Sequence, residues 1–100
     1  MNTRDAFMEK LRAKLDEWDA EIAQMEARSR QAKADKQIAY NRHIAALKQH
    51  HAEAQAQYTS IQQAPDDTWE ELKRGAEDLW ARIGAAFTNS RAELDESKAA

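Results

Sequence analysis

Between residues 11 and 61, large apolar residues recur at helical spacing and form two stripes. Successive members of a stripe lie three or four residues apart, which is the spacing of a helix that packs one face against another helix. The first stripe consists of Leu11, Leu15, Trp18, Ile22 and Met25. The second stripe consists of Tyr40, Ile44, Leu47, His51, Ala54, Tyr58 and Ile61.

The segment between the stripes, EARSRQAKADKQ at residues 26–37, has no large apolar residue. It also lacks Gly, Pro and Asn, and nearly all of its residues are good helix formers. This composition favours one continuous helix over residues 4–64, which would be about 90 Å long. The alternative is a turn at residues 29–36, which would give a three-helix bundle.

A second helix is expected after the only proline of the chain, Pro65. Proline removes a hydrogen-bond donor and disfavours helical angles in the residue before it, so the first helix should end at residue 64. The residues that follow are acidic, as they often are at a helix N-terminus. We place the second helix at residues 66–94, followed by a frayed C-terminal tail. Its apolar stripe consists of Trp69, Leu72, Ala76, Leu79, Trp80, Ile83 and Phe87.

These elements predict a single all-α domain over residues 1–100, in which the second helix folds back antiparallel on the long first helix. The charges agree with this pairing, because residues 28–51 are mainly basic and the chain from residue 66 onward is mainly acidic. The shorter helix would leave the Leu11–Met25 stripe exposed in a monomer, and a bare apolar patch marks a partner surface. We therefore expect a homodimer or a higher helical bundle, with the three stripes as its interfaces.

Composition and charge fit such a protein and narrow its partners. Ala, Glu, Lys, Arg, Leu and Gln dominate, as in long helices and coiled coils, and there is no Cys. No apolar run has the length of a signal peptide or a membrane span, so the expected location is the cytoplasm. The basic segment has no interleaved aromatic residues and the net charge is −3, so nucleic acid is not an expected partner.

His43, His50 and His51 are the only candidates for metal binding or acid–base chemistry. On one helix, His43 and His50 would lie about two turns apart, and His50 and His51 would point about 100° apart, so they suit no shared ion. No helical zinc or di-iron motif and no nucleophile with a neighbouring base is present. We therefore expect no enzyme activity, no metal and no cofactor. A metal- or pH-responsive interface built on these histidines is an alternative.

The aromatic face of the second helix suggests a different function. Trp69, Trp80 and Phe87 could insert into a lipid or storage-granule surface, as the apolar face of an interfacial helix does. The polar side of such helices is usually basic, whereas here it is acidic. Packing against another helix is therefore the preferred interpretation, and surface binding is the alternative.

The stretches DAFMEKLRAKLDEWDAEI, ADKQIAYNRHIAALK and WEELKRGAEDLWARIGAAF, which fall within residues 5–88, resemble a family of small bacterial coiled-coil stress-response proteins. That family's pattern is matched most specifically at Trp69, Leu72, Lys73, Gly75, Glu77, Trp80 and Phe87. The resemblance implies a small cytoplasmic coiled-coil protein linked to bacterial stress, with no catalytic residues to carry over. With the stripes, it predicts a non-enzymatic, self-associating scaffold, adaptor or protective protein.

Overall fold

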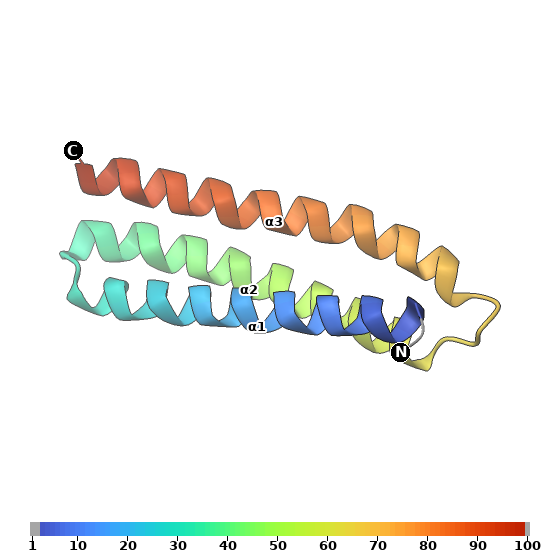
Figure 1. Ribbon diagram of the computed structural model, residues 1–100. Coiled ribbons are helices and arrows are strands. Elements are labelled where there is room, and N and C mark those ends of the chain that lie inside the picture. The colour runs from blue at the N-terminus through green and yellow to red at the C-terminus, as the bar shows by residue number, and fades with distance from the viewer. Residues whose placement is uncertain (1–2, 100) are drawn as a thin grey trace.

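The computed structural model describes the backbone of residues 3–99 and the side chains of residues 3–95. Three helices follow one another, α1 (Thr3–Gln31), α2 (Ala34–Gln63) and α3 (Trp69–Ala99). They run up, down and up along one axis, so that α1 and α3 are parallel (Figure 1). The bundle measures 51 × 19 × 19 Å along its principal axes. The chain is therefore all-α, as predicted, but it is a three-helix bundle.

A short break at Ala32 and Lys33 replaces the expected continuous helix over residues 4–64, so that expectation is wrong and the alternative turn at residues 29–36 is confirmed. Lys33 has φ −68° and ψ 159°, an extended conformation that any residue adopts. The Ala32 N–H donates to the Ser29 carbonyl, and the Gln37 N–H donates to the Lys33 carbonyl. The turn thus needs neither glycine nor proline.

Burial of the two apolar stripes explains why the chain turns there. A straight helix would gain at most about 0.7 kcal/mol per residue from helix propensity over the few residues of the break. Folding back buries large apolar side chains, each worth about 1.5–3 kcal/mol. The second term is larger, because α1 contributes all five members of its stripe to the core.

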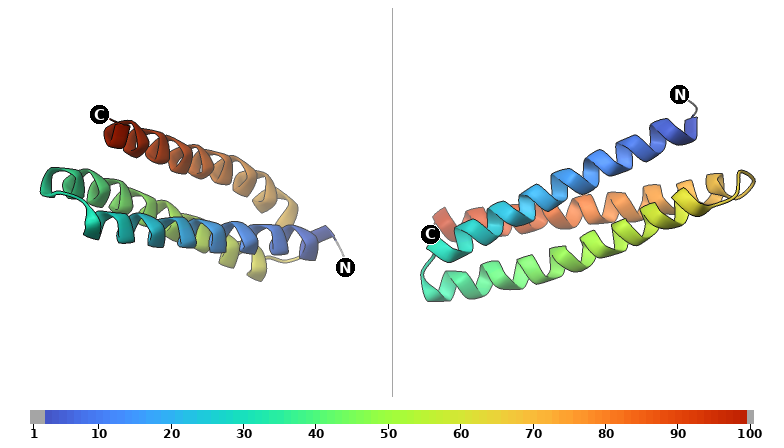
Figure 2. Two further views of the ribbon diagram at one scale, coloured as in Figure 1. Left: turned by 60° about the vertical axis from the view of Figure 1, so that its left-hand side comes forward. Right: turned by 90° about the horizontal axis from the view of Figure 1, so that it is seen from below.

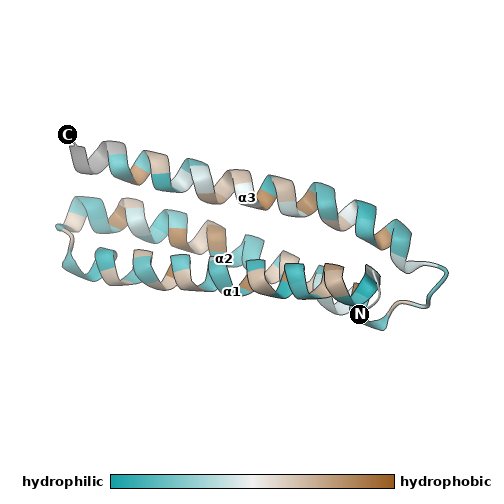
Figure 3. Ribbon diagram, viewed as in Figure 1, coloured by the Kyte–Doolittle hydropathy of each residue, from teal (hydrophilic) through white to brown (hydrophobic). Residues whose placement is uncertain are grey.

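The core lies along the bundle axis and is built from the predicted stripes (Figure 3). Among its large side chains, those of Leu47, Ile61, Ile83 and Phe87 are the most completely buried. Helix α2 packs closely against both neighbours in the three-helix arrangement of Figure 2. The backbones of α1 and α3 make few close contacts, and large side chains such as Trp18 and Trp80 meet between them. The predicted antiparallel pairing of the last two helices is therefore present. The buried apolar residues are Leu11, Leu15, Trp18, Ile22, Met25, Tyr40, Ile44, Leu47, Ala54, Ile61, Ala76, Trp80, Ile83, Phe87 and Leu94.

The connection between α2 and α3 centres on Pro65, as predicted. The Pro65 carbonyl accepts hydrogen bonds from the N–H groups of Thr68 and Trp69, which form a turn before the helix. Helix α3 begins at Trp69, within a few residues of the predicted start at 66, and continues to Ala99, so the predicted end at residue 94 is wrong. The side chain of Arg4 closes this end by donating to the last carbonyls of α2.

No helix within residues 3–99 combines the length and the apolar character that a membrane crossing requires.

Small-angle scattering distinguishes the bundle from the long hairpin. The Cα radius of gyration of the bundle is 15.9 Å. A helix of about 90 Å would by itself have a radius of gyration of about 26 Å. We expect a value close to that of the bundle when the protein is monomeric by light scattering. A monomer with a radius of gyration near that of the rod would contradict the turn at Ala32 and Lys33.

Candidate interaction groove

The residues expected to bind a second copy form the core of one chain instead. Trp18 is 3% exposed, and the other members of the Leu11–Met25 stripe are also buried. On α3, Trp80 is 7% and Phe87 1% exposed, whereas Trp69 is half-buried. These stripes are therefore not free surfaces of the folded chain. Tyr58, Leu72 and Leu79 are partly buried and pack against the same core.

An open groove runs between the first halves of α1 and α3, which we call the α1/α3 groove. Its most apolar part has a volume of about 280 Å³. Two further hollows, of about 260 and 400 Å³, share several of its lining residues and extend it toward the start of both helices. From α1 it is lined by Thr3, Ala6, Phe7, Lys10, Leu11 and Lys14, and from α3 by Trp69, Glu70, Lys73, Arg74, Glu77, Trp80 and Ala81.

Large aromatic rings separate the two helices that border this groove. The Trp18 ring stacks on Phe87 at a centroid distance of 5.3 Å and lies 5.0 Å from the ring of Trp80. Nearer the chain start, the rings of Phe7 and Trp69 lie 6.4 Å apart. Rings of this size hold the α1 and α3 backbones apart, because their side chains fill the space between the helices. The groove is the surface that this spacing leaves open.

The α1–α3 contact also contains unsatisfied polar atoms. Among the described side chains, the buried oxygen or nitrogen atoms without a hydrogen-bond partner are Glu21 Oε2 and Trp80 Nε1. Glu21 pairs with Arg91 of α3 through its other oxygen, and Trp80 packs against Trp18 of α1. Folded proteins leave few such atoms unpaired. Both belong to the contact between α1 and α3, which is the least complete of the three helix contacts.

The charges along the groove are predominantly positive. Its lining contains four cationic side chains and two carboxylates, although the whole chain has a net charge of −3. Lys73 Nζ lies over the rings of Phe7 and Trp69 at 5.5 and 5.8 Å from their centroids. Lys14 pairs with Glu17, while the side chains of Lys10 and Arg74 form no hydrogen bond or ion pair with any described residue. The groove thus offers aromatic surface beside unneutralised cations.

Two of the three histidines join helices. The sequence placed His51 in the second stripe, but it did not predict the partners of either histidine. His43 Nδ1 lies 2.9 Å from Ser90 Oγ, and its Nε2 lies 3.1 Å from a carboxylate oxygen of Glu93. A carboxylate can only accept, so the Nε2 of His43 carries the proton and donates to Glu93. His51 Nε2 lies 3.1 Å from the carbonyl oxygen of Leu15. Within residues 3–95, no group of three His, Cys, Asp or Glu side chains could hold a metal ion.

The polar contacts of these helices act as structural ties. Ser29 Oγ donates to Asn41 Oδ1 at 2.9 Å, which joins α1 to α2 near the turn. Lys48 and Glu26 form a second polar link between the same helices at 3.4 Å. Contacts of this kind fix how far one helix slides along another, because a shift would leave their donors unpaired. They fix the register of α1 against α2.

No protein-family model, curated protein or solved structure matches this chain. The resemblance to small bacterial stress-response coiled-coil proteins stays a prediction from the sequence. The groove therefore carries the functional argument. Sequence reasoning missed Phe7, Lys10 and Arg74 as groove residues, although Phe7 precedes Leu11 by four positions and extends the first stripe.

Proposed function

We propose that this protein is a non-enzymatic interaction module, an adaptor or scaffold that binds a partner's amphipathic helix in the α1/α3 groove. The open groove, with its aromatic floor and unpaired cations, carries this proposal. A fourth helix laid between α1 and α3 would complete a four-helix bundle, a common way of burying such a surface. A role in bacterial stress is the further expectation from the family resemblance.

The lining of the groove specifies the chemistry of the partner helix. Its apolar side chains, spaced three and four residues apart, would pack on Phe7, Leu11 and Trp80 and supply most of the affinity. Carboxylates beside those anchors would face Lys10 and Arg74, which no described residue neutralises. Complementary charge mainly orients the partner and speeds association. The proposed partner therefore presents an apolar stripe bordered by acidic residues.

A second copy of the chain is a less suitable occupant. The original expectation of a homodimer rested on an exposed Leu11–Met25 stripe, which is buried within one chain. Two grooves placed face to face would bring like charges together, which opposes association. Outside the core and its margins, the large apolar side chain exposed among the described residues is that of Ile38, at 65%. We therefore propose a different protein as the partner.

Lipid or granule binding gains no support from the packing of α3. Trp80 and Phe87 are core residues, so inserting them into a surface would require the bundle to open. Trp69 is the one member of that aromatic trio that is half-exposed.

Two synthetic helical peptides with identical leucine positions test the proposal, one flanked by glutamates and the other by lysines. We expect the acidic peptide to bind at least about tenfold more tightly at low salt, because opposite charges attract more strongly when screening is weak. Titration by nuclear magnetic resonance should shift the amides of Phe7, Lys10 and Trp80 and leave α2's outer face unchanged.

Charge reversal provides the matched control for this titration. The double variant Lys10→Glu with Arg74→Glu should weaken binding of the acidic peptide and strengthen binding of the basic one. Arg12→Glu with Arg82→Glu makes the same change in net charge at exposed positions outside the groove lining and should alter neither affinity by more than about twofold. Equal effects of both double variants would contradict a groove-specific partner. Groove shifts that grow with protein concentration, with a doubled mass, would identify a second copy as the occupant instead.

A further inference from the structure

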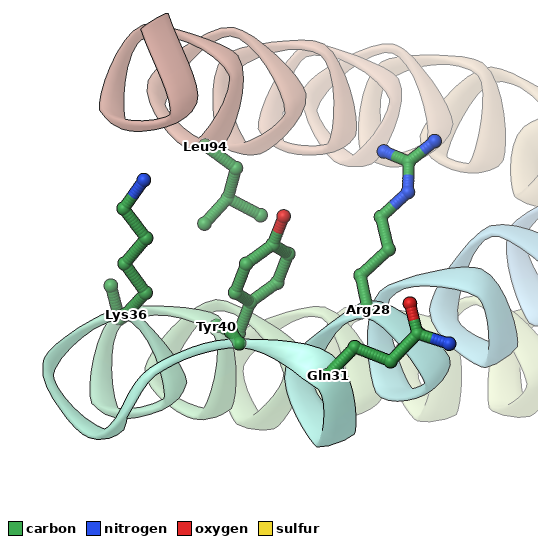
Figure 4. A pocket seen from close by; sticks show the side chains of 7 residues that line it. Arg28, Gln31, Lys36, Tyr40 and Leu94 are labelled. Atoms are coloured by element: carbon green, nitrogen blue, oxygen red, sulfur yellow. The ribbon is translucent and has the colours of Figure 1, made fainter. Parts of the chain in front are cut away.

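A second cavity lies at the opposite end of the bundle from the Pro65 connection, where the turn between α1 and α2 meets the last part of α3 (Figure 4). We call it the turn pocket. Its volume is about 320 Å³, at the lower end of the range of small-molecule sites. Its lining comes from all three helices and the turn, namely Arg28, Gln31, Ala32, Lys36, Ala39, Tyr40 and Leu94.

The turn pocket has an apolar floor and polar groups above it. Tyr40 and Leu94 are both buried and form the floor, while the small side chains of Ala32 and Ala39 leave space beside them. Figure 4 shows Arg28 and Lys36 extending toward α3 on either side of Tyr40 and Leu94. The Tyr40 hydroxyl points in the same direction. A ligand lying on the floor would therefore meet two cations and a hydroxyl together.

These polar groups have no partners within the described part of the chain. The Arg28 guanidinium and the Lys36 ammonium form no ion pair or hydrogen bond with a described residue, and neither does the Tyr40 hydroxyl. Two carboxylates close in sequence to the lining residues have other partners. Asp35 accepts a hydrogen bond from the Lys36 backbone N–H, and Glu93 pairs with His43. By contrast, Arg4, Lys48 and Arg91 all pair with carboxylates.

We propose that the turn pocket binds a small phosphate monoester with an apolar or aromatic body. A phosphate monoester, like a phosphorylated side chain, carries a charge of about −1.5 to −2 at neutral pH. The two cations of the turn pocket match that charge. The Arg28 guanidinium forms paired hydrogen bonds to two phosphate oxygens, Lys36 adds a point charge, and the Tyr40 hydroxyl donates a third contact. The apolar body of the ligand packs on Leu94 and the Tyr40 ring. The proposal is independent of the α1/α3 groove, which lies at the other end of the bundle.

Titration with phenyl phosphate tests this site. We expect saturable amide shifts confined to the lining of the turn pocket at millimolar ligand. Inorganic phosphate should bind more weakly because it lacks the apolar body, and benzoate should bind more weakly because it carries one charge. Shifts that are equal for all three anions would overturn the proposal, since they would show general attraction to the basic turn. Absence of saturation by phenyl phosphate would overturn it as well.

Matched substitutions separate the pocket from its surroundings. Arg28→Gln and Lys36→Gln should each raise the dissociation constant of phenyl phosphate by at least about tenfold, and Tyr40→Phe by about threefold. Arg30→Gln and Lys33→Gln each remove a like charge at an exposed position that lies near the turn but does not line the pocket. These two variants should change the dissociation constant of phenyl phosphate by less than about twofold. Circular dichroism should show unchanged helix content for all five variants. Equal losses in the pocket and control variants would contradict a specific site.

Discussion

Replacing Trp18 with alanine is expected to lower the free energy of unfolding by about 3–5 kcal/mol, the range for truncating a buried tryptophan. Trp18 is 3% exposed and contacts both Trp80 and Phe87, so its removal leaves a cavity where α1 meets α3. A domain of this size is stable by only about 5–15 kcal/mol in total. Urea denaturation followed by far-ultraviolet circular dichroism should show a much lower midpoint, or no cooperative transition at all.

Two controls identify the cause of that loss. Ile38→Ala removes an exposed apolar side chain of α2 and should change the free energy of unfolding by less than about 0.5 kcal/mol. Light scattering should detect a monomer both for the unsubstituted protein and for the Trp18→Ala variant. A stable Trp18→Ala variant whose only change is a smaller mass would mean that Trp18 packs between chains, in contradiction to the bundle.

Arg4→Ala should produce the second large effect, a loss of about 2 kcal/mol, which is the range for hydrogen bonds from a charged group. Arg4 Nη2 donates to the carbonyl oxygens of Ile61 and Ala64 at 2.6 Å and of Gln62 at 3.2 Å. The last carbonyls of a helix have no partner within it and mark the negative end of its dipole. The Arg4 side chain is only 19% exposed, so water replaces these bonds incompletely. Thermal unfolding should reveal the loss.

The geometry of the guanidinium, beyond its charge, should matter at this position. Arg4→Lys keeps the positive charge, but an ammonium lacks the planar guanidinium that donates to several carbonyls at once. We therefore expect its stability to lie between that of the original protein and that of Arg4→Ala. Asp66→Ala should leave the unfolding midpoint unchanged, because the carboxylate that pairs with Arg4 is fully exposed. Full stability of Arg4→Lys would show that charge alone is sufficient. A large loss for Asp66→Ala would show that the ion pair, and not the carbonyl contacts, holds this end.

The apolar pattern predicted which side chains are buried more accurately than it predicted what buries them. The stripes of α1, α2 and α3 all face the core, because helical spacing depends only on local geometry. The turn at Ala32 and Lys33 could not be read in the same way. Its residues are helix formers with ordinary backbone angles, so only the packing of α1 on α2 reveals it. Once that turn is missed, an intramolecular core is mistaken for an oligomer interface.

The candidate sites depended on the same missing information. The α1/α3 groove exists because α1 and α3 become parallel neighbours, which a long hairpin does not produce. Phe7 and Lys73 are 66 positions apart in sequence, and nothing in their local spacing indicates that a lysine lies over that ring. The turn pocket likewise joins Arg28 to Leu94 only after the chain has reversed twice. Basic character near the turn was visible in the sequence, but its placement around Tyr40 was not.

The brevity of both connections has a consequence for the order in which the molecule assembles. Each helix is packed against its neighbour in sequence across a turn of a few residues, so most contacts close small loops with little loss of chain entropy. Bundles dominated by such local contacts fold in about microseconds to milliseconds. The contacts between α1 and α3, such as that of Trp18 with Trp80, span the longest stretches of chain. We expect these contacts to form after the others, so that the groove side of the bundle is the last to close and the first to open.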